Sequence, residues 1–153
     1  MDEFDNHPGG LTQGERLLLC AVRMLAAENG CNSLRPSFEH ACGCSGRQAF
    51  GALEVFVQQL RLHSQRRIAV TPPAVRGPTP DEALMLEAFA CAQADDYRGL
   101  DDRLAELTGG LTPSALGAAA CLVADAFAMN GLVLRSPVGL APPARSEARR
   151  SWA

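Results

Sequence analysis

The chain has 153 residues, of which 47% are hydrophobic and 5% aromatic, and its net charge is −3. This length suits one domain with a single core, and the negative charge disfavours a general nucleic-acid-binding protein. All 14 basic residues are arginine, which excludes any mechanism that needs a lysine and is typical of a GC-rich bacterial genome.

Helix starts are predicted by hydroxyl residues that can cap a first turn, some with an acid or amide three residues later. Four sites carry this chemistry: Thr12 with Glu15, Ser45 with Gln48, Thr79 with Glu82, and Thr112. Glycines that can end helices follow at Gly30, Gly109 and Gly131. We therefore expect five main helices, over 13–29, 46–65, 80–94, 96–108 and 113–130, and a short helical turn at 36–42.

The fold class expected from this pattern is all-α. Alanine and leucine are abundant while β-branched residues are scarce, so we expect a compact helical bundle over residues 11–134. A proline-rich connection, "RRIAVTPPAVRGP" at 66–78, joins the second and third main helices. We expect residues 1–10 to be flexible, and residues 135–153 to form a flexible tail rich in arginine and proline.

The sequence also predicts where in the cell the protein is found. The first ten residues are acidic and lack the pattern of a signal peptide. The most apolar segment, 113–129, is too short and too weakly hydrophobic to span a membrane. We therefore expect a soluble, cytoplasmic protein whose six cysteines are free thiols or ligands and do not form disulfides.

A group of cysteine and histidine residues is the strongest candidate for a metal site. Cys31, His40, Cys42 and Cys44 supply four soft ligands within fourteen residues, which suits zinc, copper or an iron–sulfur cluster. The spacing lacks the paired C-x-x-C pattern of structural zinc sites. The alternative is a tight turn of small residues around Gly43 with His40 at the surface, and the absence of any cofactor is then the simpler expectation.

The same stretch allows a redox interpretation. Cys44 precedes the predicted helix at 46, where the helix dipole favours a thiolate, and Cys42 lies close enough in sequence to resolve an oxidised Cys44. The other cysteines, Cys20, Cys91 and Cys121, lie in apolar helical runs and are expected to act as small hydrophobic residues.

Asp125 is the only charged residue between Pro113 and Asn130. A buried carboxylate needs a partner, and Arg16 and Arg23 are the predicted candidates. Three interpretations remain: a catalytic acid in a cavity between the first and last helices, a structural ion pair, or a carboxylate that faces water.

The run "RLHSQRR" places Arg61, His63, Arg66 and Arg67 at the end of the second main helix. Cations there complement the negative end of the helix dipole. The same residues are our candidates for binding an acidic partner protein, and the arginine-bearing tail is a second candidate.

The function that we predict is that of a small bacterial regulatory or protein-interaction protein without catalytic residues, acting through a helical surface. The chain carries no catalytic or nucleotide-binding motif that we could recognise, and its partner would be another protein, met at a groove beside helices 46–65 and 96–108 or at the tail. A homodimer also remains open, whereas nucleic acid and membrane are disfavoured as partners. The alternative function is a metal-binding or redox-sensing protein that uses Cys31, His40, Cys42 and Cys44.

Overall fold

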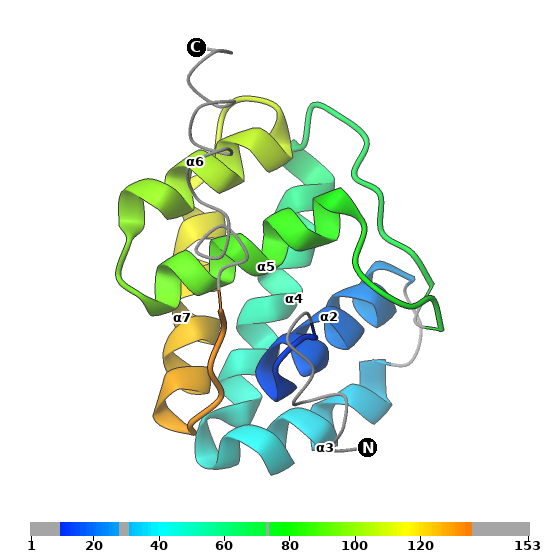
Figure 1. Cartoon of the computed structure of the whole chain (residues 1–153), viewed down its shortest axis with the longest axis vertical. Coiled ribbons are helices and arrows are strands. Elements are labelled where there is room, and N and C mark those ends of the chain that lie inside the picture. The colour runs from blue at the N-terminus through cyan, green and yellow to red at the C-terminus, as the bar shows by residue number, and fades with distance from the viewer. Residues whose placement is uncertain (1–9, 28–30, 73, 136–153) are drawn as a thin grey trace.

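Helices make up most of the part of the chain that the structure describes. The computed structural model describes residues 10–27, 31–72 and 74–135, with only the backbone of residues 31–33. Its helices are α2 (Gln13–Ala26), α3 (Cys31–Cys42), α4 (Gly46–His63), α5 (Pro80–Gln93), α6 (Tyr97–Thr108) and α7 (Ser114–Met129), with a 3-10 turn at Gly43–Ser45 (Figure 1). No residue in these ranges forms a strand, so the predicted all-α bundle is confirmed.

Helix α4 is the centre of the bundle. It passes through the middle of the molecule and makes its most extensive contact with α7, while α2 and α3 also pack against it (Figure 1). The ring of Phe38 in α3 contacts Phe50 in α4 and Phe127 in α7, with ring centroids 5.5 and 5.8 Å apart. Phe56 and Phe89 form a second pair across α4 and α5 at 4.6 Å. The core is therefore built where α4 meets its neighbours.

Two of the four predicted helix caps are confirmed. Thr12 and Thr79 have extended backbones, and each forms a capping box with the glutamate three residues later, Glu15 or Glu82. Each side-chain oxygen accepts a hydrogen bond that the first turn of the helix would otherwise lack. The sequence pattern therefore located the starts of α2 and α5.

The other two caps are wrong. Ser45 has a helical backbone, φ −83° and ψ −6°, because the 3-10 turn leads directly from α3 into α4, and its side chain makes no cap. The first residue of α7 is Ser114, so Pro113 and not Thr112 holds the cap position. The buried Thr112 hydroxyl has no hydrogen-bond partner in the described structure. A hydroxyl caps a helix only where its own backbone is extended at the boundary.

Helix α3 is a second correction, because the sequence predicted only a short turn at 36–42. Pro36 lies inside the helix, where it lacks an N–H to donate. Leu34, Phe38 and Cys42 recur at intervals of four residues, and each is at most 4% exposed. Burial of this face outweighs the local cost of the proline.

Residues 132–135, which follow α7, are tied to the bundle. Gln93 accepts a hydrogen bond from the Leu134 N–H at 2.9 Å and donates one to the Leu132 carbonyl at 3.0 Å. The Arg135 N–H donates to the Glu15 carboxylate at 2.6 Å. Arg135, which we assigned to the tail, is thus anchored, while residues 1–9 and 136–153 lie outside the described residues. Nowhere in the described ranges is a helix both apolar and long enough to cross a bilayer.

Candidate binding site

The predicted metal ligands lie around the junction of α3 and α4. His40 and Cys44 are exposed, whereas Cys42 is buried, and the side chain of Cys31 is outside the described part. Among the described side chains, no group of three or more histidine, cysteine, aspartate or glutamate residues is arranged to hold a metal ion. Because Cys31 is not described, the four-ligand site stays a prediction.

Small residues are required at this junction by its geometry. Gly43 has φ +59°, a left-handed backbone that favours glycine. A Cβ atom on Gly46 would lie 2.5 Å from the Cα of Glu39 and 2.6 Å from the carbonyl oxygen of Phe38. The turn therefore brings the start of α4 against the backbone of α3. This requirement explains the two glycines and leaves the role of Cys44 open.

We expect the cysteines to differ strongly in alkylation rate. Burial raises the pKa of the Cys42 and Cys91 thiols, while Cys20 and Cys44 are exposed. Since the thiolate is the reactive form, iodoacetamide at pH 7.5 should modify Cys20 and Cys44 well before it modifies the buried thiols of Cys42 and Cys91. Peptide mass spectrometry of timed samples measures the order.

The comparison between the two exposed cysteines tests the redox interpretation. If the start of α4 favours a thiolate, Cys44 should react faster than Cys20, and unfolding in urea should abolish the difference. Equal rates in the folded protein would contradict a reactive Cys44. Rapid reaction of Cys42 would contradict the burial described here.

Asp125 is not a buried acid, which was one basis for the interpretations in the sequence analysis. Its side chain is exposed on α7, which matches the interpretation of a carboxylate facing water. Arg23, one of its predicted partners, instead pairs with Glu82 of α5, with Nη2 2.9 Å from Oε1. The exposed fractions are 4% for the Arg23 side chain and 0% for that of Glu82. The sequence thus pointed to a buried ion pair but identified the wrong carboxylate.

Two neighbouring acids, Asp81 and Glu82, hold the connection between α4 and α5, and we call them the carboxylate clamp. The Ala69 N–H donates to Asp81 at 2.7 Å, and the Thr71 N–H donates to Glu82 at 2.8 Å. Arg66 forms an ion pair with Asp81. These bonds draw the connection onto the first turn of α5.

Arg23 holds the far part of the same connection. Its guanidinium donates to the Val75 carbonyl at 2.6 Å and to the Gly77 carbonyl at 2.7 Å, in addition to binding Glu82. One buried side chain therefore joins α2, α5 and the connection. Sequence reasoning missed this role, although a single arginine in the apolar run "LLLCAVRMLA" was the available signal.

The carboxylate clamp should make stability depend on pH. Burial alone would raise both pKa values, but hydrogen bonds from arginine side chains and backbone N–H groups outweigh it, so both lie below the ordinary 3.8 for Asp81 and 4.5 for Glu82. A carboxyl whose folded pKa is lowered stabilises the fold above its unfolded pKa. This stabilisation is lost as the pH falls below about 4.5 towards the folded values.

Urea unfolding at pH 7, 5, 4 and 3 measures this dependence. We expect the unfolding free energy to fall most steeply below pH 4.5 in the natural chain, and less steeply in Glu82→Gln, which cannot ionise at this position. The same dependence of unfolding free energy on pH in both proteins would show that Glu82 does not contribute to it.

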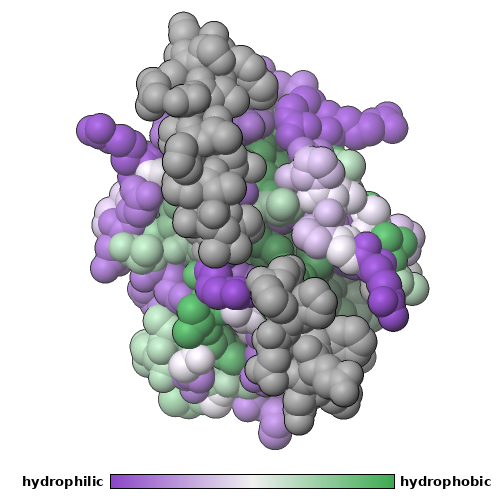
Figure 2. Space-filling view, in the orientation of Figure 1, coloured by the Kyte–Doolittle hydropathy of each residue, from purple (hydrophilic) through white to green (hydrophobic). Residues whose placement is uncertain are grey.

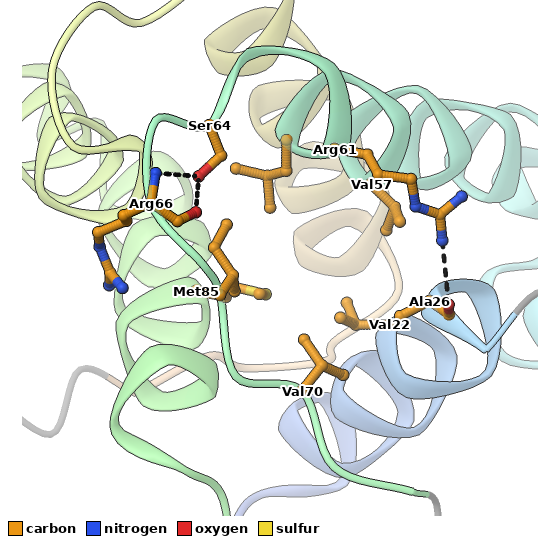
Figure 3. A pocket seen from close by; sticks show the side chains of 10 residues that line it. Val22, Ala26, Val57, Arg61, Ser64, Arg66, Val70 and Met85 are labelled. Carbon is orange, nitrogen blue, oxygen red and sulfur yellow. Dashed lines mark hydrogen bonds between the residues drawn. The ribbon is translucent and has the colours of Figure 1, made fainter.

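A cavity of about 390 Å³ lies between α2, α4, α5 and the connection (Figure 3). It is lined by Val22, Ala26, Val57, Leu60, Arg61, Ser64, Arg66, Ile68, Val70 and Met85. The groove that we expected beside α4 and α6 stays a prediction, and this cavity lies on the side of α4 that faces α2 and α5. The connection folds back along this side of α4, so that Ile68 and Val70 line the cavity. In Figure 2, hydrophilic residues lie mainly along the upper edges of the face, and hydrophobic residues are visible at its lower left and between the grey atoms near its middle.

The predicted partner-binding cations surround one end of this cavity. Arg61 and Arg66 belong to its lining, while His63 and Arg67 are exposed nearby in sequence. Arg61 donates to the carbonyls of Leu25 and Ala26 at the end of α2, at 3.3 and 3.0 Å. The guanidinium of Arg66 points away from the cavity towards its ion pair (Figure 3). Two of the four cations therefore also have structural contacts.

Leu62 is exposed among these cations, with 65% of its surface accessible. We refer to Arg61, Leu62, His63, Arg66 and Arg67 together as the basic end of α4. Such a mixture of arginine and apolar surface is common where proteins bind one another. No family model, curated protein or solved structure matches this chain, so its function must be inferred from its own residues.

Proposed function

We propose that the chain is a small non-catalytic regulatory protein that binds an acidic protein partner at the basic end of α4. One observation carries the proposal: Leu62 and His63 are exposed at the end of α4, and Arg67 is exposed in the connection just after it, next in sequence to Arg66. An apolar side chain framed by cations offers contact area together with attraction for carboxylates. The rigid bundle holds this surface in place, because Arg61 and Arg66 are bound to α2 and α5.

Selection from a random peptide library displayed on phage tests the proposal without a known partner. Peptides selected on the immobilised protein should be rich in aspartate and glutamate next to apolar residues. Arg67→Glu should weaken binding of the selected peptides by about tenfold or more, and Leu62→Ser should also weaken it. Both residues are exposed and their replacement should leave the fold intact.

Arg98→Glu is the matched control, since Arg98 is exposed on α6 and its reversal changes the net charge by the same amount. We expect its peptide binding to stay within about twofold of the natural chain. Selected peptides without acidic residues, or equal losses in Arg67→Glu and Arg98→Glu, would reject the basic end of α4 as the binding surface.

A further inference from the structure

The cavity beside α4 has a mainly apolar lining. Seven of its ten lining residues are apolar, from α2, α4, α5 and the connection: Val22, Ala26, Val57, Leu60, Ile68, Val70 and Met85. Several of them are scarcely accessible to water; Val22 and Met85 are both 3% exposed. The recess has a volume of about 390 Å³ and opens to the surface, which gives a ligand a path into it. Its size and lining are typical of sites for small molecules.

The polar groups of the lining are engaged with the protein itself. The Ser64 hydroxyl donates to the Arg66 carbonyl at 2.7 Å, and Arg61 donates to carbonyls at the end of α2. The guanidinium of Arg66 binds Asp81 and the Glu106 carbonyl. A charged ligand would have to compete for groups that already have partners, and it would lose its hydration on entering.

We propose that this cavity binds an uncharged, largely apolar small molecule, such as a fatty alcohol or an aromatic compound. The ligand would lie against Val22, Val57 and Met85, and the flexible thioether of Met85 can adjust to its shape. An engineered cavity of about 150 Å³ accepts benzene, so by proportion this cavity of about 390 Å³ has room for roughly sixteen carbon atoms. The cavity shares Arg61 and Arg66 with the basic end of α4, but its apolar lining does not depend on the function proposed for that surface.

Fluorescence titration with N-phenyl-1-naphthylamine, a neutral apolar probe, tests the proposal on the full chain. We expect saturable binding at one site, with displacement by 1-decanol at concentrations about tenfold lower than by decanoate or decylamine. Equal displacement by decanoate and 1-decanol would show that the site does not discriminate against an anion and would overturn the proposal. The absence of saturable binding would also overturn it.

Two variants locate the probe. Val57→Trp fills the cavity and should weaken probe binding at least about tenfold, whereas Val55→Trp on the exposed side of the same helix should leave it within about twofold. Ala26→Phe is a second filling variant, for use if circular dichroism shows that Val57→Trp does not fold. Equal binding by the filled and control variants would place the probe on the surface and reject the cavity.

Failure of the small-molecule proposal can be distinguished from failure of the proposed function. If Val57→Trp abolished binding of the selected acidic peptides while the neutral probe never bound, the cavity would belong to the protein partner and the small-molecule proposal would fail. If the probe bound in the cavity and no acidic peptides were selected, the proposed function would fail and the ligand site would stand.

Discussion

Arg23→Met is expected to lower the free energy of unfolding by about 3–5 kcal/mol, because removing one partner of a buried ion pair leaves the other charge without compensation. Glu82 is completely buried and would keep only its bonds to N–H and hydroxyl groups. The carbonyls of Val75 and Gly77 would lose their donors as well. Urea denaturation at pH 7, followed by circular dichroism, measures the change.

The double variant Arg23→Met/Glu82→Gln separates the unpaired charge from the lost packing. It should be more stable than the sum of the two single changes predicts, because no buried charge remains. Arg23→Lys should fall between Arg23→Met and the natural chain, since lysine keeps the charge but lacks the forked geometry that reaches Glu82 and two carbonyls. A loss below about 1 kcal/mol in Arg23→Met would contradict the buried pair.

Gly46→Ala should be the most damaging glycine replacement in α4. The new Cβ would lie within 2.6 Å of backbone atoms of Phe38 and Glu39, and backbone cannot move aside as a flexible side chain can. Forcing α3 and α4 apart would disturb the contact between Phe38 and Phe50. We expect a loss near the upper end of the overpacking range, about 3 kcal/mol.

Gly51→Ala is the matched control, because Gly51 lies in the same helix and its added Cβ would have nothing within 4 Å. Alanine is favoured over glycine inside a helix, so this variant should gain about 0.5–1 kcal/mol. Thermal and urea unfolding of the two variants side by side measure the expected loss of stability in Gly46→Ala and the expected gain in Gly51→Ala. A neutral Gly46→Ala would contradict the close approach of α3 and α4.

The cavity and the carboxylate clamp share the connection between α4 and α5. Ile68 and Val70 line the cavity, while Ala69 and Thr71 donate their N–H groups to Asp81 and Glu82. The clamp binds backbone N–H groups and the cavity is lined by the residues that alternate with them, so one stretch serves both purposes. The bonds of the clamp therefore also set the position of one cavity wall.

Local chemistry in the sequence determined the starts of two helices and the end of a third. Thr12 with Glu15 and Thr79 with Glu82 located the starts of α2 and α5, because a capping box involves residues within one turn. Gly109, with φ +84°, ended α6 as expected. The basic end of α4 was also readable as a candidate surface, since its cations are neighbours in the chain. Its role in binding stays a prediction.

Only the tertiary structure decided how distant segments meet. Arg23 and Glu82 are 59 residues apart, and the sequence did not show that Glu82, already a helix cap, would also bind Arg23. The same limit applies to α3, which persists through Pro36 because Phe38 is buried against α4 and α7. The cavity arises where the connection folds back over α4. Capping depends on neighbours within one turn, whereas ion pairs, burial and cavities depend on which surfaces the whole chain brings together.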